Sequence, residues 1–300
     1  MPTELGLSAF STALADLAER VSPAVVQVRA GGARPTTGTV VGEDRILAVD
    51  HTIAEDEGLV VRTADGREVR AEVAGHDPST DLALLRAPGL GVAPLAPAAA
   101  PRVGAVSLAL GRSPSGRLVA GAGIISTVGA TLHSGRGPRV DNLIVTHAGP
   151  FRGFSGGAIV EAGGGLIGIG NAGLVRGTGL VVPIATAKRV ADALDAHGRV
   201  TRGYLGITGQ PVRLRESQRA GRDRAAGLLI VGIAPDSPAE RAGLLVGDIV
   251  LTFAGEPVAG TDELLSRLTL ERVGTSVPLD VIRAGAARTV QVTVGETTLS

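Results

Sequence analysis

The chain of 300 residues contains no cysteine. This absence excludes disulfide bonds, thiolate metal sites and cysteine nucleophiles together. It does not fix the cellular compartment, because many exported proteins also lack cysteine. Aromatic residues are scarce too, with four phenylalanines, one tyrosine and no tryptophan, so alanine and valine supply most of the apolar side chains.

The chain also has no excess of charge and no long apolar run. Lys and Arg number 29, Asp and Glu number 29, and no block of like charges suggests a nucleic acid or an anionic lipid as partner. In the first 21 residues Asp16, Glu19 and Arg20 break up the apolar residues, which excludes a signal peptide or a membrane anchor there. As written the chain is expected to be cytoplasmic, although a periplasmic or other extracytoplasmic protein whose leader had been removed would look the same.

Glycine, in contrast, is abundant, with 44 residues. Short apolar runs broken by glycine roughly every eight to twelve residues predict a mainly β fold. Two sets of six strands separated by a Pro- and Ala-rich connector suggest a pair of small barrels. The expected strands are Val25–Val28, Thr37–Val41, Ile46–Val49, Leu59–Arg62, Glu68–Ala74 and Leu82–Leu85, then Val106–Leu110, Ala120–Ser126, Leu143–Thr146, Ala158–Val160, Leu166–Ile169 and Leu180–Val182.

Helical spacing marks both ends of this double barrel. A short amphipathic helix capped by Ser8 or Ser11 is expected before Ser22-Pro23, and a second helix is expected over Ile184–His197 with Gly198 as its C-cap. We therefore expect an N-terminal helical segment over residues 1–22 and a two-barrel domain over 23–198.

After a linker at Arg199–Arg202, a separate domain is expected over residues 203–296. Thr261 is the expected N-cap of its longer helix. Its expected strands are Tyr204–Ile207, Leu228–Ile233, Ile249–Phe253, Ser276–Arg283 and Thr289–Val294, with helices at Pro238–Ala242 and Asp262–Arg272.

One stretch has the composition of a nucleophile loop. Ser155 lies in Gly153-Phe154-Ser155-Gly156-Gly157 and is followed by an apolar strand. Acyl transfer needs an exposed serine hydroxyl beside backbone N–H groups that can bind an oxyanion, and glycines allow the sharp turn and the close approach of a substrate. The alternative is a glycine-rich hairpin turn with an incidental serine.

A serine nucleophile needs a base, and His51 is the best placed of the five histidines because it directly follows a predicted strand. The other four lie before a turn, in a Gly/Ser-rich loop, a few residues before Ser155 and at a helix end: His76, His133, His147 and His197. None has partners at a metal-binding spacing, so neither a metal ion nor a cofactor is expected.

The base must in turn be oriented by a carboxylate, for which Asp81 is the candidate. It opens the apolar strand Leu82–Leu85, where an acid is costly to bury unless it is partnered. Asp77, which precedes Pro78, is better explained as a turn cap. The order His51, Asp81, Ser155 is that of chymotrypsin-type double barrels and not that of subtilisins or α/β-hydrolases.

With these residues, nearly the whole chain resembles the HtrA/Deg family of serine proteases, which have a chymotrypsin-like double β-barrel followed by a PDZ domain. The resemblance rests on short motifs that occur in the family's order: Val21-Ser22-Pro23-Ala24-Val25-Val26, Val49-Asp50-His51-Thr52-Ile53, Asp77-Pro78-Ser79-Thr80-Asp81-Leu82, Gly121-Ala122-Gly123-Ile124-Ile125-Ser126, Gly153-Phe154-Ser155-Gly156-Gly157, Leu180-Val181-Val182-Pro183, Ser237-Pro238-Ala239-Glu240 and Gly247-Asp248-Ile249-Val250. Tyr204-Leu205-Gly206-Ile207 resembles the loop with which PDZ domains bind a peptide carboxylate. The resemblance implies a bacterial protease of protein quality control and the stress response.

Two departures from the family pattern lie in the nucleophile loop. Arg152 and Phe154 stand there, where family members usually carry Pro-Gly-Asn before the serine. If these residues hold the loop in an unproductive state, Phe154→Asn is expected to raise the basal activity.

The resemblance implies a serine endopeptidase that acts on unfolded or misfolded proteins. Ser155 would be the nucleophile, His51 the general base, Asp81 its orienting acid, and the N–H groups of Gly153 and Ser155 the oxyanion hole. The family also implies a preference for apolar P1 residues, binding of peptide C-termini by the PDZ domain, and trimers assembled through N-terminal segments, with Phe10 as a candidate contact or simply as a packing residue. The alternative function is that of an inactive pseudoprotease that holds peptides in a chaperone-like manner.

Overall fold

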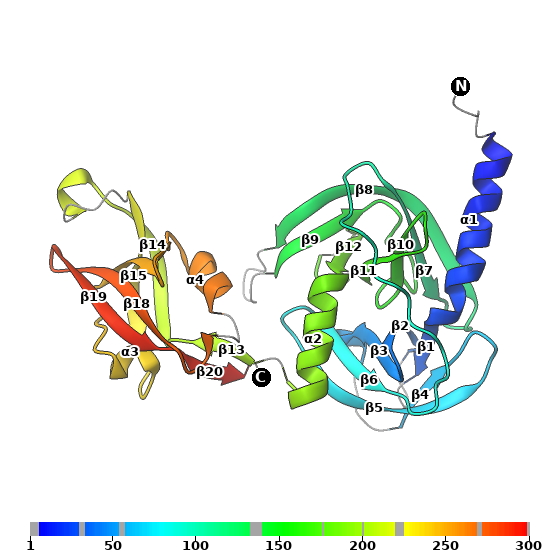
Figure 1. Ribbon diagram of the computed structural model, residues 1–300, viewed down its shortest axis with the longest axis horizontal. Coiled ribbons are helices and arrows are strands. Elements are labelled where there is room, and N and C mark those ends of the chain that lie inside the picture. Colours follow the sequence, from blue (N-terminus) through cyan, green and yellow to red (C-terminus); the bar gives the residue numbers. More distant parts are fainter. Residues whose placement is uncertain are drawn as a thin grey trace. The chain divides into compact units, whose positions relative to one another are not determined.

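The computed structural model describes residues 6–29, 34–53, 58–132, 140–175, 177–199, 201–219, 225–268 and 272–298, so His133 lies outside the described residues. The chain divides near residue 200 into two compact units (Figure 1). Both are built mainly from β-strands, with few helices.

The first unit begins with a closed six-stranded barrel in the order β1-β2-β3-β6-β5-β4. Successive side chains of a strand point to opposite faces of the sheet, so a strand that is buried on both faces contributes to two cores. In β3, Ile46 and Ala48 point into the barrel core, whereas Leu47 packs with Leu194 outside it. The strands are β1 (Val25–Arg29), β2 (Thr36–Gly42), β3 (Arg45–Val49), β4 (Leu59–Arg62), β5 (Glu68–Asp77) and β6 (Leu82–Arg86).

A second closed six-stranded barrel follows in the order β10-β11-β12-β9-β8-β7. Small and branched side chains such as Ala109, Ile125, Ile144 and Val181 fill part of its core together with one aromatic ring, Phe154. The strands are β7 (Val106–Arg112), β8 (Leu118–Leu132), β9 (Val140–Thr146), β10 (Ala158–Glu161), β11 (Leu166–Asn171) and β12 (Leu180–Pro183).

Two helices pack on these barrels: α1 (Leu7–Val21) buries Leu17 and Val21, and α2 (Ile184–His197) buries four residues. The predicted C-cap is confirmed, because Gly198 has a left-handed φ of 69° and its N–H donates to the carbonyl of Leu194. The predicted N-cap of α1 is wrong: Gly6 occupies that position, and Ser8 and Ser11 lie inside the helix. None of the helices in the described part of the chain is long and apolar enough to cross a membrane.

The second unit contains a sheet in the order β14-β15-β16-β18-β19 and a separate pair, β13 with β20. The strands are β13 (Thr201–Tyr204), β14 (Ile207–Arg213), β15 (Ala226–Ile233), β16 (Ile249–Phe253), β17 (Glu256–Pro257), β18 (Ser276–Arg283), β19 (Ala286–Thr293) and β20 (Gly295–Thr298). The helices are α3 (Pro238–Arg241) and α4 (Thr261–Arg267), and the core is formed around Leu228, Val250, Phe253 and Val281.

Four local predictions for this unit are wrong. The residues assigned to a linker include the start of β13 at Thr201, and the longer helix ends at Arg267 and not at Arg272. The single strand expected over Tyr204–Ile207 is two strands separated by Leu205 and Gly206, and the φ of Gly206 is 80°. Gly260, and not Thr261, is the N-cap of α4, because the Thr261 hydroxyl instead donates to the carbonyl of Gly209 in β14 at 3.2 Å. The mainly β class, the two barrels and the additional domain are confirmed.

Candidate active site

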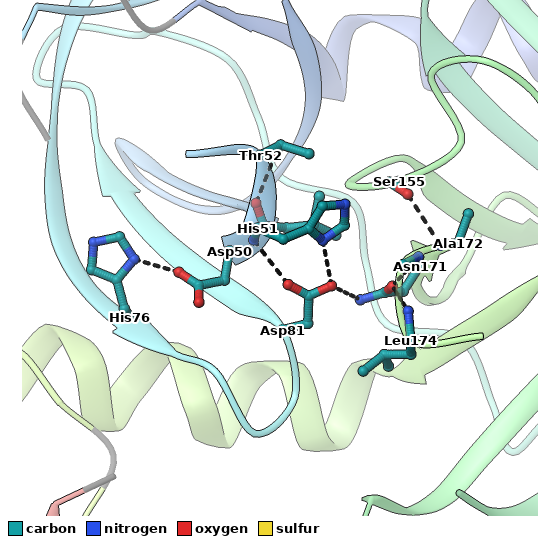
Figure 2. Close-up of polar contacts among 11 residues, drawn as sticks. Asp50, His51, Thr52, His76, Asp81, Ser155, Asn171, Ala172 and Leu174 are labelled. Atoms are coloured by element: carbon teal, nitrogen blue, oxygen red, sulfur yellow. Dashed lines mark hydrogen bonds and ion pairs between the residues drawn. The ribbon is translucent and has the colours of Figure 1, made fainter. Parts of the chain in front are cut away.

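His51 lies in a single 3-10 turn, Asp50–Thr52, that directly follows β3 (Figure 2). The Thr52 hydroxyl donates to the carbonyl of Val49 at 2.8 Å and stabilises this turn. Asp81 accepts two hydrogen bonds from His51: the backbone N–H reaches Oδ1 at 2.9 Å, and ring Nδ1 lies 2.7 Å from Oδ2. The carboxylate therefore fixes both the backbone and the ring of His51.

Asp81 lies where a tight turn enters β6 and is 8% exposed. The turn is organised by Asp77, whose carboxylate accepts hydrogen bonds from the hydroxyls of Ser79 and Thr80, which confirms Asp77 as a turn cap. Asp81 itself has a left-handed φ of 55°, a conformation that aspartate tolerates better than most residues. Its carbonyl also accepts the N–H of Asp50 at 3.1 Å.

A third residue completes the surroundings of the carboxylate and was missed from the sequence. Asn171, the last residue of β11, is fully buried and donates from Nδ2 to Asp81 Oδ2 at 2.9 Å. Its Oδ1 accepts the N–H groups of Gly173 at 2.9 Å and Leu174 at 3.0 Å. A polar residue ending an apolar strand was the available signal, since an amide is costly to bury without partners.

These contacts shift the pKa values of both groups. The hydrogen bond to Asp81 raises the pKa of His51 above its usual value, against the opposing effect of burial, and the negative charges of Asp81 and Asp50 add to the rise. Burial alone would raise the pKa of Asp81, but the hydrogen bonds from His51 and Asn171 outweigh it and hold that pKa below its usual value. Asp81 is thus a carboxylate at neutral pH, and His51 gains a proton readily.

Asp50 offers a test of the charge next to His51. It precedes His51, and its carboxylate binds Nδ1 of His76 in β5 (Figure 2). The negative charge of Asp50 raises the pKa of His51. Because the base must be neutral, kcat/KM of the wild type should fall tenfold per pH unit below this pKa, which lies above the usual ~6.5. We expect Asp50→Asn to move this acid limb of the pH profile to lower pH.

The measurement is the pH profile of kcat/KM for the wild type, Asp50→Asn and a control, Asp65→Asn, which changes an exposed aspartate in the turn between β4 and β5. The control should leave the limb in place. A limb that Asp50→Asn leaves unmoved, or shifts to higher pH, would contradict this electrostatic account.

Ser155 lies in the loop between β9 and β10, flanked by Gly153 and Gly156 with left-handed φ values of 95° and 81°. Its Oγ accepts the N–H of Ala172 at 3.0 Å, which leaves the hydroxyl proton available. The next residue, Gly173, lies against the His51 ring, since a Cβ there would be 2.4 Å from Cε1. Ser155 and His51 are therefore neighbours through this two-residue segment.

In the described part of the chain no hydrogen bond joins Ser155 Oγ to His51. Hydrogen bonds of this kind are often long in unliganded enzymes and shorten when the substrate binds. Within the same described residues, the N–H groups of Gly153 and Ser155 donate to no acceptor, so both are available for an oxyanion.

Phe154 is a core residue, which changes the outcome expected for Phe154→Asn. Its side chain is 1% exposed, and its ring meets that of Phe151 edge-on at 5.7 Å between centroids. Glycines make room for it, because a Cβ at Gly149 would lie 2.3 Å from the ring and one at Gly170 would lie 3.0 Å from it. An asparagine would leave a cavity and bury an unpaired amide, so activation is no longer expected.

We expect Phe154→Asn to lower the free energy of unfolding by roughly 3–5 kcal/mol, the range for removal of a buried aromatic ring. Phe10→Asn is the matched control, since that ring is 43% exposed. Urea denaturation of both variants measures the difference. Equal losses of stability, or a rise in proteolytic activity with Phe154→Asn, would contradict the assignment of Phe154 to the core.

The predicted peptide-binding residues lie at the start of the second unit. Tyr204 ends β13, Leu205 is 2% exposed in the core, and Ile207 begins β14. The carbonyls of Leu205 and Gly206 accept N–H groups of Ala239 and Ala234, both at 2.8 Å. Within the described residues their own N–H groups donate to no acceptor.

The fold of the second unit itself requires glycine at position 206. A Cβ there would lie 2.2 Å from Cβ of Ser237 and the backbone has a positive φ, so the protein itself excludes a side chain. The unpaired N–H groups nevertheless leave a place for a carboxylate.

Comparisons with known proteins match both units of the chain. A trypsin-like peptidase domain matches residues 36–169, and a PDZ domain matches residues 203–294. The serine endoprotease DegS of Escherichia coli K12 is 31% identical, with 92% of this chain and 84% of DegS covered. A probable periplasmic DegP-like endoprotease of Ectopseudomonas mendocina is 32% identical over 86% of this chain, which spans only 56% of that relative's length.

Solved structures are similar over most of both chains. The serine endoprotease of Yersinia pestis has a TM-score of 0.77 at 30% identity, covering 95% of this chain and 98% of its own. The HtrA-type protease AlgW, solved with a decapeptide, has a TM-score of 0.82 at 26% identity, covering 96% and 99%.

Proposed function

Since this chain belongs to the HtrA/Deg family of serine endoproteases, we propose that it cleaves peptide bonds in unfolded or misfolded proteins through Ser155, His51 and Asp81. The observation that carries the proposal is the double contact of Asp81 with the backbone N–H and ring Nδ1 of His51, beside an accessible Ser155. This is the arrangement that a serine protease needs to hold its base in one tautomer.

In the proposed mechanism Ser155 Oγ attacks the scissile carbonyl, and His51 Nε2 takes the hydroxyl proton. The Asp81 carboxylate stabilises the imidazolium that forms. The N–H groups of Gly153 and Ser155 bind the oxyanion of the tetrahedral intermediate. His51 then gives its proton to the leaving amine. Water next attacks the acyl-enzyme while His51 takes a proton from it, and His51 returns a proton to Ser155 Oγ as the carboxylic acid product leaves.

Degradation of casein, an unfolded protein, tests this proposal. The wild type should degrade casein to peptides, and Ser155→Ala, purified in the same way, should not. Degradation by both proteins would assign the activity to a contaminant. If neither the wild type nor Ser155→Ala degrades casein, the result would favour the alternative of an inactive protein that holds peptides.

We further propose that the PDZ domain binds the free C-terminus of a peptide. Among the described residues β14 is an edge strand that pairs with β15, so its other edge can accept an added strand. The peptide carboxylate would meet the N–H groups of Leu205, Gly206 and Ile207. Ile207 and Leu265 are the candidates for contact with its last side chain, since Ile207 is half-buried and Leu265 is exposed, whereas Leu205, Leu264 and Leu268 belong to the core.

Peptides that end in a free carboxylate and an apolar residue should therefore bind the full chain with micromolar affinity. Amidation of the C-terminus removes a charge-assisted hydrogen bond and should weaken binding by roughly 1.5–3 kcal/mol. Calorimetry with Ser155→Ala, which cannot cleave the ligand, measures both peptides. Equal affinities would contradict binding through the carboxylate.

A homo-oligomer is proposed from the family resemblance alone. Leu7 and Phe10 on α1 are 88% and 43% exposed, so both are accessible to a second copy of the chain.

A further inference from the structure

The turn that carries Ser155, residues 153–156, is held partly by its own barrel, since the Phe154 ring lies in the core and the Gly156 N–H donates to the carbonyl of Gly170 at 2.9 Å. Gly153 and Gly156 both have left-handed φ values and no side chain, and glycine loses the most conformational freedom on folding. Their backbones pack tightly against other strands: a Cβ on Gly156 would be 1.9 Å from the carbonyl oxygen of Thr37, and one on Gly153 would be 2.3 Å from that of Arg112. The two glycines therefore depend on contacts from other strands.

Two buried threonines of β2 supply such contacts from the first barrel. The Thr37 hydroxyl donates to the carbonyl of Gly153 at 2.7 Å, and the Thr39 hydroxyl donates to that of Gly156 at 2.8 Å. Both threonines are fully buried, and their spacing of two places them on one face of the strand. The carbonyls on either side of Ser155 are thus both held by side chains of the opposite barrel.

Thr37 also accepts a hydrogen bond. The backbone N–H of Arg112, the last residue of β7, donates to Thr37 Oγ1 at 2.9 Å. A carbonyl can only accept, so the Thr37 hydroxyl donates its single proton to the carbonyl of Gly153, which is closer than that of Arg112 at 3.4 Å. Two consecutive hydrogen bonds therefore link the Arg112 N–H of β7, through Thr37 of β2, to the carbonyl of Gly153.

We propose that Thr37 and Thr39 are positioning residues for the proposed proteolysis, which hold the turn so that the N–H groups of Gly153 and Ser155 point together at the oxyanion. They touch neither substrate nor reacting atoms and act through the turn. The Gly153 carbonyl lies in the rigid peptide plane between residues 153 and 154, which is adjacent to both planes that carry the N–H groups of Gly153 and Ser155, and the Gly156 carbonyl fixes the plane at the end of the turn. Oxyanion stabilisation depends on such preorganisation.

The test compares Thr37→Val and Thr39→Val, which remove the hydroxyls at nearly constant volume, with Thr37→Ser and Thr39→Ser, which keep them. Misplacement of catalytic groups by a mutation outside the reacting atoms costs up to about 10²-fold, so we expect each valine variant to lower kcat by roughly 10- to 100-fold with little change in KM. A peptide boronate, whose adduct places a negative oxygen in the oxyanion hole, should bind more weakly in parallel. Both serine variants should retain activity.

Thr63→Val is the matched control, because Thr63 is also buried in the first unit but bonds within the turn to Asp65 and Arg67. Circular dichroism confirms folding before each assay, and Thr37→Ala and Thr39→Ala replace any valine variant that does not fold. Folded variants with unchanged kcat and boronate affinity, or serine variants that fail to restore them, would overturn the inference. A wild type that neither cleaves casein nor binds the boronate would instead contradict the proposed function, and this inference with it.

Discussion

Ser155→Ala and His51→Ala are each expected to lower kcat by about 10⁴- to 10⁶-fold, and the double variant should lose little more. The reason is that the two side chains act as one unit. Without the base the hydroxyl is a weak nucleophile, and without the hydroxyl the base has no proton to take. The residual rate then comes from substrate binding and oxyanion stabilisation alone.

Hydrolysis of a fluorogenic peptide, followed for the two single variants and the double variant, measures this effect. Ser115→Ala and His197→Ala are matched controls at an exposed turn and at the end of α2, and both should keep wild-type rates. Losses that multiply in the double variant would show that Ser155 and His51 do not share one catalytic step.

Asp81→Asn is expected to lower kcat by about 10⁴-fold while leaving the fold intact. The carboxylate accepts from His51 Nδ1 at 2.7 Å, from the backbone N–H of His51 at 2.9 Å and from Asn171 Nδ2 at 2.9 Å, so all three contacts require an acceptor. An amide in its place has a donor that must face one of these groups. His51 would then be held in the tautomer that presents a protonated Nε2 to the serine, which cannot take its proton.

The same peptide assay, with Asp65→Asn as control, measures the loss for Asp81→Asn. Rescue at high pH would not be expected, because the defect is one of tautomer and not of protonation. A loss smaller than tenfold would mean that Asp81 is not the group that orients His51.

The fold could be predicted where a local pattern reports the structure directly. Short apolar runs between glycines located the strands of both barrels, and Gly198 marked the end of α2 because its position requires a positive φ. The sequence pattern failed where contacts with distant residues decide the local structure. Thr261 has the composition of an N-cap, but its hydroxyl bonds to Gly209 of a neighbouring strand, and β13 forms only because β20, almost a hundred residues later, pairs with it.

The candidate site shows the same division. Ser155, His51 and Asp81 could be proposed because each lies in a recognisable local motif. The partners of Asn171 and Thr37 could not be predicted, because each lies far away in the sequence: Asp81 for Asn171 and Gly153 for Thr37. Phe154 was misjudged for a related reason: its environment is made by Gly149 and Gly170, whose lack of side chains leaves the space that its ring fills.

The central claim is that Ser155 is a nucleophile activated by His51. Reaction with diisopropyl fluorophosphate, followed by mass spectrometry of the digested protein, tests it most directly, because the reagent marks only a serine that can attack. The account predicts one adduct, on Ser155, in the wild type, none in Ser155→Ala and very slow labelling in His51→Ala. A wild type that stays unmodified, or an adduct on another serine, would contradict it.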